Sequence, residues 1–517
     1  MKLKNELWLI TNLSNNWIYG IGMKPEVLKE KLAQPEFRRY RFEHDFYWFC
    51  VYYFREYFTF DTPKSFLEIY ETLQEWKNLY FEGFRWCSKT TMAQMYVVWC
   101  IVYKKRRNIM WYSQTVENAE ENLMYIANAL IWDSEQWERI VNDFWNLYYP
   151  ERVNKKWQKR IKKLDKFITE NSCYVRAFSL WSSPRGKNYT AEDGKHRPDL
   201  FIFDDVDTIN SCSSKSKIDR HFTFLLNEVL GWATTNTQIL FLGNTIYEDG
   251  LVPRFREHIQ NNEHWNIFRI PIYDKEWKIV WNRFVETDAE ADELNKWIED
   301  LSKKYVSLEA EKKQLGSVSF AQNYLLIPYV AAQHLITKDL IQYIDERDEE
   351  LMYKSSSYFN KIQIGVDPAI STKEKSDRFA ITVVGFRYDK RYVLEVVALE
   401  GRDKMVSNAC SVVRSLYLKR HANKVVVESV AYQAVLKDLF SSLWLAVKEI
   451  KPHKDKLTRL MEKQALFEQG KIFFSRQCSK LIDELLAFPN WEHDDCVDSL
   501  VYWLDESNEP EVKIYFI

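Results

Sequence analysis

The chain has 517 residues, of which 46% are hydrophobic and 28% charged, so it is long enough for two or three domains with sizeable cores. The net charge of −2 excludes a global basic field, so any contact with nucleic acid has to come from local basic patches. The eight cysteines include no C-x-x-C pair and the nine histidines show no ligand spacing, which predicts reduced thiols in a cytosolic protein and no structural zinc site. No apolar run reaches the ~18 residues of a membrane span, and the first residues lack the apolar core of a signal peptide.

Residues 1–60 are rich in aromatic side chains and have a helix-like pattern. The aromatic residues from Phe46 to Phe60 are suited to stacking on an adenine, but packing in a core or a lid is the favoured interpretation. Pro63 suits the first turn of the next helix. The apolar residues of that helix fall on one face: Phe66, Leu67, Tyr70 and Leu73.

A candidate phosphate-binding loop follows a predicted strand at residues 78–81. Gly83, Lys89 and Thr90 fit the pattern G-x-x-x-x-G-K-[ST], whereas Ser88 replaces the second glycine. This pattern supplies N–H groups around phosphates, a lysine for the β/γ oxygens and a hydroxyl for Mg²⁺. Ser88 is small enough for the loop, although it lacks the freedom of glycine at positive φ. The competing interpretation is a helix that Ser88 merely caps.

The apolar helix after this loop is predicted from Thr90 to Tyr103, and its N-terminus would face the anion. A basic run at 104–107 fits a solvated helix end as well as a DNA contact. The segments that follow are a strand at 108–113, a helix from Val116, a hairpin formed by 166–170 and 173–180, and a flexible basic loop at 182–188.

The chain is organised around residues 197–207, Arg-Pro-Asp-Leu-Phe-Ile-Phe-Asp-Asp-Val-Asp. Its apolar centre predicts a strand buried on both faces, and Asp204, Asp205 and Asp207 follow at the carboxyl end, where parallel sheets bind ligands. Adjacent carboxylates are unfavourable there unless a cation meets them, and nucleotide-bound Mg²⁺ is the usual cation. Alone, the pattern also fits a strand that runs into an acidic turn; the phosphate-binding loop upstream favours the magnesium site.

A further buried strand is predicted at 237–245, and its tip, Gly243, Asn244 and Thr245, is suited to sensing a γ-phosphate or the attacking water. The alternation of strands and helices up to this point predicts a mostly parallel α/β sheet. A long charged helix is then expected from Asp288 to Leu315. A connector follows, and a new domain begins before Ile362.

The second domain carries acidic residues on three separate elements. A strand at 362–367 ends in Asp367, and a later strand at 424–428 ends in Glu428; between them, 379–386 and 392–399 extend the first into an antiparallel meander. Asp495 and Asp498 lie three residues apart, so they share one face of a helix that begins near residue 493.

Three acidic positions on two strand ends and a helix fit a two-metal phosphodiester hydrolase. Each carboxylate alone also fits a turn residue or a helix cap. The metal site requires that the strand of Asp367 lies beside the strand of Glu428, with the helix of Asp495 packed across their ends. Lys456 and Arg459 are candidates for contacts to DNA phosphates, and a solvated helix face fits them equally well.

Taken together in this order, these motifs resemble the large terminase subunits of tailed bacteriophages and prophages over about residues 60–505. The segments that carry the resemblance are Gly83-Phe-Arg-Trp-Cys-Ser-Lys-Thr-Thr91, Arg197-Pro-Asp-Leu-Phe-Ile-Phe-Asp-Asp205, Leu240-Phe-Leu-Gly-Asn-Thr245, Gly365-Val-Asp-Pro368, Val425-Val-Val-Glu428 and His493-Asp-Asp-Cys-Val-Asp498, with Lys456 and Arg459 ahead of Glu468-Gln-Gly-Lys-Ile-Phe-Phe474.

The resemblance implies an N-terminal ATPase of the ASCE P-loop class joined to a C-terminal RNase H-like nuclease. The corresponding boundaries are an N-terminal or lid segment at 1–60, a motor domain at 61–325, a connector at 326–357 and a nuclease domain at 358–517. Such proteins use ATP to drive double-stranded DNA into a procapsid through the portal, and they cut concatemeric DNA. The partners implied are DNA, the portal and procapsid, a small terminase subunit and a pentameric ring. The location implied is the cytoplasm of a bacterial host, outside the mature virion.

The resemblance also implies roles for individual residues. Gly83, Arg85, Ser88, Lys89, Thr90 and Asp204 would bind ATP, with Thr90 and Asp204 on Mg²⁺. Asp205 stands where the family usually has a catalytic glutamate, and Asp207 is the alternative base. Gly243, Asn244 and Thr245 would form the coupling motif, and Arg185 resembles a trans-acting arginine finger. Asp367, Glu428 and Asp495 would hold the nuclease Mg²⁺ or Mn²⁺ ions, with Asp498 as a candidate fourth ligand.

A helicase-like ATPase fused to a nuclease for DNA repair or defence stays open as an alternative, as does a degenerate binding protein that no longer hydrolyses ATP.

Overall fold

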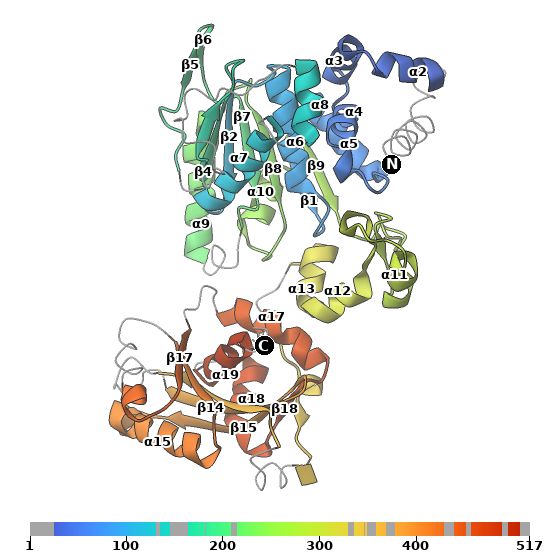
Figure 1. The fold of residues 1–517 in the computed structure, drawn as a ribbon. Helices are drawn as coiled ribbons and strands as arrows, with labels where there is room; N and C mark the ends of the chain where they lie inside the picture. The colour runs from blue at the N-terminus through green and yellow to red at the C-terminus, as the bar shows by residue number, and fades with distance from the viewer. Residues whose placement is uncertain are drawn as a thin grey trace, which may run out of the picture. The chain divides into compact units, whose positions relative to one another are not determined.

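The computed structural model describes most of the chain in two units (Figure 1). The residues described are 25–130, 135–144, 164–180, 182–207, 215–328, 335–345, 347–348, 358–368, 378–428, 439–450, 456–488 and 495–506. The first unit consists of Met1–Val285, Glu290–Tyr305 and Asn323–Leu326, and the second of Glu286–Ala289, Val306–Gln322 and Ile327–Ile517.

The first unit is built on a seven-stranded sheet with the order β3-β4-β2-β7-β8-β1-β9. All neighbouring strands are parallel except the edge pair β3 and β4. The predicted mostly parallel α/β sheet is therefore confirmed. The strands are β3 (Lys166–Ile168), β4 (Tyr174–Ser179), β2 (Asn108–Ser113), β7 (Leu200–Asp204), β8 (Gln238–Gly243), β1 (Asn78–Gly83) and β9 (Trp265–Ile270).

Helices cover both faces of this sheet, which explains why its central strands are unbroken apolar runs. Every residue of β7 and β8 is buried. Aromatic residues on one face, among them Phe203 and Phe241, pack against α10 (Leu251–Ile259) and the π-helical segment Leu225–Val229. The other face lies against α6 (Lys89–Val102) and α7 (Val116–Leu130) (Figure 1).

The N-terminal helices pack through their aromatic side chains. Phe46, Phe49 and Tyr53 of α4 are fully buried, and Phe46 lies edge-on to Tyr96 of α6. The favoured interpretation, packing, is therefore confirmed for this helix. The other helices of the first unit are α2 (Pro25–Leu32), α3 (Pro35–Glu43), α5 (Lys64–Gln74), α8 (Glu135–Phe144) and α9 (Lys215–Phe224), and α4 spans Phe46–Tyr53.

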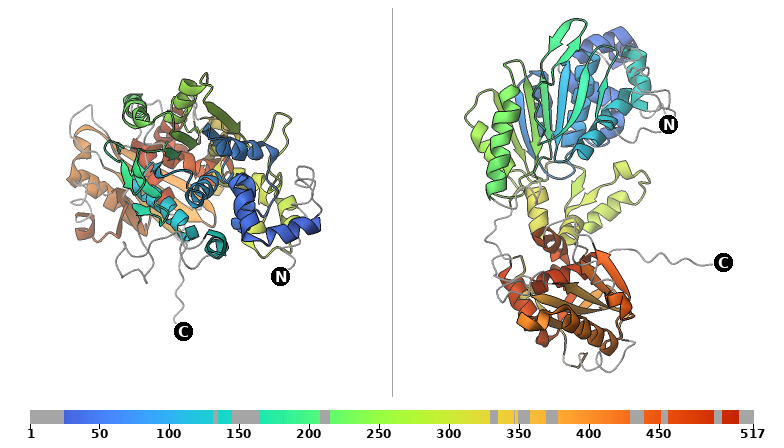
Figure 2. Two further views of the ribbon diagram at one scale, coloured as in Figure 1. Left: turned by 90° about the horizontal axis from the view of Figure 1, so that it is seen from above. Right: turned by 90° about the vertical axis from the view of Figure 1, so that its left-hand side faces the viewer.

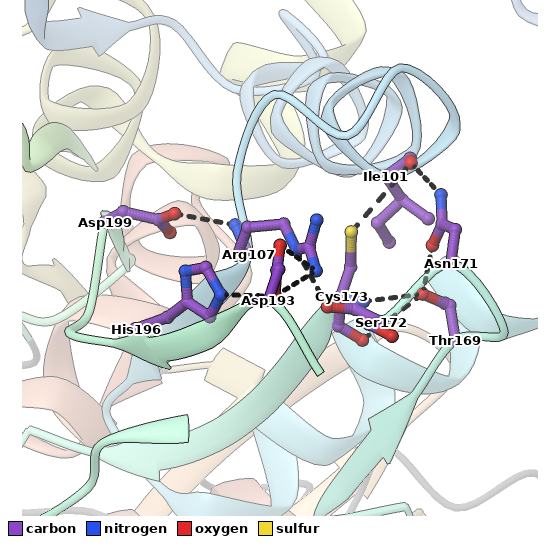
Figure 3. A network of polar contacts seen from close by, with 9 residues as sticks. All are labelled: Ile101, Arg107, Thr169, Asn171, Ser172, Cys173, Asp193, His196 and Asp199. Carbon is purple, nitrogen blue, oxygen red and sulfur yellow. Dashed lines mark hydrogen bonds and ion pairs between the residues drawn. The ribbon is translucent and has the colours of Figure 1, made fainter. Parts of the chain in front are cut away.

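A hairpin of β5 (Tyr189–Ala191) and β6 (Gly194–His196) projects past one end of the first sheet (Figure 2). Arg107, just before β2, anchors it: the guanidinium lies 3.0 Å from Asp193 and donates to the carbonyl of Ser172, and His196 lies 2.9 Å from Asp193 (Figure 3). This network lies at the amino end of β2, opposite the carboxyl ends where a parallel sheet binds ligands. Part of the basic run at 104–107 therefore holds the fold together.

The expected single helix from Asp288 to Leu315 is wrong, because the chain breaks it twice. Helix α11 ends at Asn295, whose side-chain amide donates to the carbonyl of Tyr305 and accepts from its N–H, at 2.9 and 2.8 Å. Ser307 then caps a separate helix by accepting from the N–H of Ala310 at 3.0 Å. The side chains of Asn295 and Ser307 bond to backbone groups that a continuous helix would have paired internally. The prediction of one long helix rested on its many charged residues and did not take this competition into account. The elements are α11 (Asp288–Asn295), a 3₁₀ turn (Leu301–Lys303), β11 (Val306–Ser307) and α12 (Leu308–Leu315), followed by α13 (Ser317–Phe320).

The second unit contains another seven-stranded sheet, with the order β12-β18-β15-β14-β13-β16-β17. The predicted meander is confirmed, since β13, β14 and β15 pair antiparallel in sequence order. Strand β12 joins this sheet beside β18, although it lies in the stretch expected to be a connector. The strands are β12 (Gln342–Tyr343), β18 (Ile472–Phe474), β15 (Lys390–Leu399), β14 (Phe379–Arg387), β13 (Lys361–Asp367), β16 (Lys424–Glu428) and β17 (Val447–Ile450).

The helices of the second unit are α15 (Val406–Lys419), α17 (Lys456–Glu468), α18 (Ser479–Ala487) and α19 (Asp495–Glu506). Buried residues of β13 and β14 form a core with Ala409, Val413 and Leu416 of α15. Helix α19 packs on β13 and β14 and also contacts α17 and α18. Across the described parts of both units, no helix is long and apolar enough to cross a membrane.

Candidate active sites

The phosphate-binding loop leads from the end of β1 into α6. A side chain at Gly83 would meet the sulfur of Cys87 at 2.5 Å and the ring of Phe81 at 2.9 Å, so a larger residue there would force these side chains to move. Ser88 adopts φ 63° and ψ 27°, the left-handed conformation that the motif's second glycine usually supplies, and its side chain makes no capping hydrogen bond. The sequence departs from the motif at Ser88, but the backbone keeps the conformation that the motif needs.

Lys89 joins the loop to the neighbouring strand β8. Its buried ammonium group donates to the carbonyl of Gly83 and to Oδ1 of Asn244, both at 3.0 Å. Burial alone would lower the lysine pKa, but the sulfur of Cys87 and the charges of Asp205 and Asp204 raise it. The lysine therefore stays charged, and it already touches a residue of the predicted coupling motif.

Thr90 and Asp204 meet at the carboxyl edge of the sheet. The threonine hydroxyl lies 2.9 and 3.1 Å from the two oxygens of a carboxylate that is only 4% exposed. Burial and then the charge of Asp205 raise the pKa of Asp204 to about 8, against the smaller opposing effects of Thr90 and Lys89. A buried carboxylate that is this difficult to ionise fits a site that receives a cation, and the hydroxyl and carboxylate oxygens are ligands that suit Mg²⁺.

The structure separates the two candidates for the catalytic base. Asp207 is buried and accepts the N–H of Val252 at 2.9 Å, so it caps the first turn of α10. Asp205 is exposed, has φ 45° and donates its backbone N–H to the carbonyl of Leu242 at 3.2 Å. Asp205 lines a cavity together with Thr90 and Asp204, which favours it over Asp207 as the base.

The two predicted arginines both lie on exposed loops. Arg85 donates its backbone N–H to the carbonyl of Asn323 at 2.7 Å, and its guanidinium lies 5.5 Å from the ring centroid of Trp86. The side chain of Arg185 is 66% exposed and lies 3.2 Å from Glu228. Neither guanidinium contacts the Lys89 or Asp204 side chain through a described hydrogen bond or ion pair.

A cavity lined by aromatic residues adjoins the loop at Ser88. Tyr57, Phe58, Phe60 and Trp281 line it, together with Thr91, Met92 and Met95 at the start of α6. The aromatic stretch from Phe46 to Phe60 is thus divided: its first part lies in the core, and its last residues line a cavity next to the loop. Flat apolar walls of this kind accept the ring of a nucleotide base.

Sequence reasoning missed Glu82, a fully buried carboxylate one residue before Gly83. It accepts from Arg256 at 2.6 Å, from Arg269 at 3.0 Å and from the hydroxyl of Tyr80. The network ties the strand before the loop to α10 and β9. An acidic residue inside an otherwise apolar strand was the available signal, because such a residue is rarely buried without partners.

In the second unit, the predicted strand neighbours are confirmed. Strands β13 and β16 pair in parallel with Val366 opposite Val427, so Asp367 and Glu428 end adjacent strands at the same edge. Helix α19 begins with Asp495, which is 5% exposed and accepts the backbone N–H of Arg378 at 2.9 Å. Within the described residues no group of three or more His, Cys, Asp or Glu side chains has the arrangement of a metal site, and the side chain of Glu428 lies outside that description.

The second unit places Arg459 differently from either expectation. Its guanidinium, in α17, lies 3.2 Å from Asp498, and the two side chains are 6% and 2% exposed. A DNA contact and a solvated helix face would both need an exposed guanidinium, and Arg459 is instead a buried ion-pair partner. The hydrophobic pattern of α17 alone does not show whether Arg459 is exposed on the helix or buried in an ion pair. The side chain of Lys456 lies outside the described residues.

Glu484 in α18 is a second acidic residue that the sequence did not single out. It is 2% exposed, accepts the N–H of Cys496 at 2.9 Å and lies 3.3 Å from the guanidinium of Arg378. Burial raises the pKa of Glu484. Arg378 and Glu484 together hold the first turn of α19, and therefore the backbone that carries Asp495.

Comparison with known proteins finds a family match within the second unit. Residues 364–506 match the family model of the terminase RNase H-like domain. This part of the chain is therefore similar to terminase RNase H-like domains. No curated protein matches the sequence.

Solved structures extend the likeness to 86% of the chain. A large terminase from the thermophilic bacteriophage D6E, in crystal form 3, is 10% identical with a TM-score of 0.52, covering 86% of this chain and 99% of that one. The same terminase in complex with ATP-γ-S is 11% identical over the same shares, again with a TM-score of 0.52. The chain therefore has the fold of a phage large terminase, which confirms the resemblance and the predicted fold class.

Proposed function

We propose that this protein is the large subunit of a DNA-packaging terminase, which hydrolyses ATP to move double-stranded DNA into a procapsid and cuts the DNA with a metal-dependent nuclease domain. The observation that carries the proposal is the pairing, within one chain, of the Lys89, Thr90 and Asp204 cluster with a terminase RNase H-like domain.

In the ATPase half, the loop from Gly83 to Ser88 surrounds the phosphates, and Lys89 exchanges its contacts with Gly83 and Asn244 for β/γ oxygens. Thr90 and Asp204 would hold Mg²⁺, which would neutralise charge on the phosphates. Asp205 acts as the base, and Asn244 with its neighbours Gly243 and Thr245 senses whether the γ-phosphate is present. The purine ring of the nucleotide lies in the aromatic cavity beside Ser88. The aromatic side chains of that cavity supply a stacking surface, which holds a purine without distinguishing one purine from another.

Packaging requires a motor that holds DNA at changing points, and we propose a ring of subunits, a pentamer, that assembles on the portal. The exposed side chain of Arg185 reaches the ATP of a neighbouring subunit, and Arg85 contacts phosphate in its own. A small terminase subunit presents the DNA. Mixing Arg185→Ala with Lys89→Ala subunits tests this arrangement: recovered ATP hydrolysis supports action in trans, and full hydrolysis by an isolated monomer contradicts it.

In the nuclease half, Asp367, Glu428 and Asp495 would hold the Mg²⁺ or Mn²⁺ ions, which would supply activation of water and stabilisation of the leaving oxygen. Their donor set, carboxylates at two adjacent strand ends and a helix start, suits such ions. Asp498 is the candidate fourth ligand, held in place by Arg459. Lys456 contacts DNA phosphates, so cutting has little sequence preference.

Purified wild-type protein tests the proposal when incubated with ATP and supercoiled plasmid in Mg²⁺, Mn²⁺ or EDTA. We expect release of phosphate and metal-dependent cleavage of duplex DNA. Stimulation of ATP hydrolysis by procapsids that carry a portal separates a packaging motor from a helicase-like repair enzyme, which procapsids leave unaffected. Nucleotide binding without any turnover identifies a degenerate binding protein instead.

A further inference from the structure

A polar cavity of about 380 Å³ opens over the ends of β2 and β7, beside the Asp204–Asp205 pair. A water occupies about 30 Å³ in the liquid, so the space holds several waters. The lining comes from α6, from α7 and from the two strand ends: Thr90, Gln94, Ser113, Asn118, Glu121, Asn122, Tyr125, Asp204 and Asp205. Since Thr90 and Asp204 belong to the candidate ATP site, water in this cavity has access to that site.

The last residue of β2 indicates that the cavity receives a polar ligand. Ser113 is 2% exposed, and its hydroxyl oxygen has no hydrogen-bond partner within the described protein. A buried hydroxyl left unpaired is unfavourable by about 1–3 kcal/mol, so a water or a ligand oxygen is expected against it. Ser113 and Asp205 line the same cavity, so an oxygen bound at Ser113 shares that cavity with the proposed base.

Helix α7 presents a polar face to this cavity. Asn118, Glu121, Asn122 and Tyr125 are spaced at i, i+3, i+4 and i+7, and all four line it. Asn122 accepts from Gln94 of α6 at 2.7 Å and donates to the carbonyl of Asn118 at 3.0 Å, which fixes this face of the helix. Among the lining residues, Glu121 is the one carboxylate outside the Asp204–Asp205 pair, and it is exposed.

Positioning the attacking water at this strand end requires a carboxylate that reaches further than Asp205. Asp204 accepts a hydrogen bond from Thr90 and is the proposed magnesium ligand, and the side chain of Asp205 is one methylene shorter than that of a glutamate. We propose that Glu121 is a further catalytic residue of ATP hydrolysis, which holds and deprotonates the attacking water together with Asp205, while Ser113 hydrogen-bonds to it. This inference rests on the proposed ATPase function.

The step balances as a hydrolysis. The oxygen of the water forms a bond to the γ-phosphorus while the bond from that phosphorus to the β,γ-bridging oxygen breaks, and ADP leaves with the electron pair. The proton of the water passes to the carboxylate of Glu121 or Asp205 and then to solvent. Phosphate and ADP are the products, and no further reactant is needed.

Substitution at Glu121 tests the inference in the full-length protein. Glu121→Gln keeps the shape and the polar contacts of the side chain but removes its basicity, so we expect kcat for phosphate release to fall about 10²-fold with unchanged affinity for ATP. Ser113→Ala removes one hydrogen bond to the water and should lower kcat about 5-fold. Glu117→Gln is the matched control, because Glu117 is an exposed acid in the first turn of the same helix and does not line the cavity.

A second substitution, at Asp205, distinguishes a catalytic role of Glu121 from a structural one, because it should rescue turnover only if Glu121 acts on the water. Asp205→Glu lengthens the carboxylate at the strand end by one methylene, so adding it to Glu121→Gln should recover most of the lost turnover. The inference is overturned if Glu121→Gln turns over within twofold of the wild type, or if its loss appears in ATP affinity and not in kcat. A wild-type protein that releases no phosphate overturns the proposed function itself, whereas an active Glu121→Gln variant overturns only the role of Glu121.

Discussion

Replacing Asp204 by asparagine should make the nucleotide-free protein more stable while it abolishes ATP hydrolysis. The carboxyl group is buried, and burial with the nearby charge of Asp205 raises its pKa from 3.8 to about 8. The folded state therefore binds a proton more tightly than the unfolded state does. The stability of the wild type consequently falls as the pH rises from about 4 to about 8. Asparagine carries no charge, so it does not incur this loss.

The magnitude follows from the two pKa values. At pH 7 this difference in pKa destabilises the folded wild type by about 4 kcal/mol relative to an uncharged side chain, and at pH 5 by only about 2 kcal/mol. The asparagine amide keeps an acceptor for the hydroxyl of Thr90, but its buried N–H groups reduce the gain by about 1–3 kcal/mol. We therefore expect Asp204→Asn to stabilise the first unit by about 1–3 kcal/mol at pH 7 and to have almost no effect at pH 5.

Hydrogen exchange followed by mass spectrometry measures this unit by itself, because peptides from β1, β7 and β8 report its opening separately from the second unit. The samples contain EDTA and no nucleotide, since a bound cation would reverse the sign. Asp205→Asn is the control, and it should stabilise less, because it removes only the second of the two causes. Equal protection of wild type and Asp204→Asn at pH 7, or a gain that is as large at pH 5, would refute the reasoning.

Other substitutions probe separate features of the structure. Ser88→Gly relieves a left-handed serine and should raise stability by about 1 kcal/mol without lowering ATP turnover; a lower melting temperature would contradict the strain. Glu82→Ala leaves two arginines without their buried partner and should destabilise the first unit by about 2–3 kcal/mol in urea unfolding, whereas Glu82→Gln should be milder. Glu484→Ala should lower plasmid cleavage at least tenfold with ATPase activity intact, since it loosens the turn that carries Asp495; unchanged cleavage would show that the turn holds without it.

The sequence predicted the strands well because their apolar runs are unambiguous. The strand ending in Asp204 and the pairing of the Asp367 and Glu428 strands both follow from short apolar runs that stop at a carboxylate, and the structure has them. The prediction of a single helix from Asp288 to Leu315 was wrong because the side chains of Asn295 and Ser307 bond to nearby backbone groups. The helix propensity of a single residue contains little information about such local hydrogen bonds.

Individual side-chain roles were harder to predict, because they depend on which element comes to lie opposite. Nothing in the spacing of Arg459 and Asp498 shows that their helices meet, and an arginine in an amphipathic helix is usually exposed. Asp207 stood as an alternative base until α10 was seen to place the N–H of Val252 on its carboxylate. Glu121 belongs to no sequence motif; the packing of α7 against α6 and β2 is what brings it to the cavity.

The most direct test of the account compares Lys89→Ala with Asp367→Ala in two assays on the same preparations, phosphate release from ATP and cleavage of supercoiled plasmid in Mn²⁺. The two clusters of residues lie in different units, so we predict that Lys89→Ala loses ATP hydrolysis and still cuts DNA, while Asp367→Ala hydrolyses ATP at the wild-type rate and no longer cuts. Cutting by Asp367→Ala, or ATP hydrolysis by Lys89→Ala, would contradict the account.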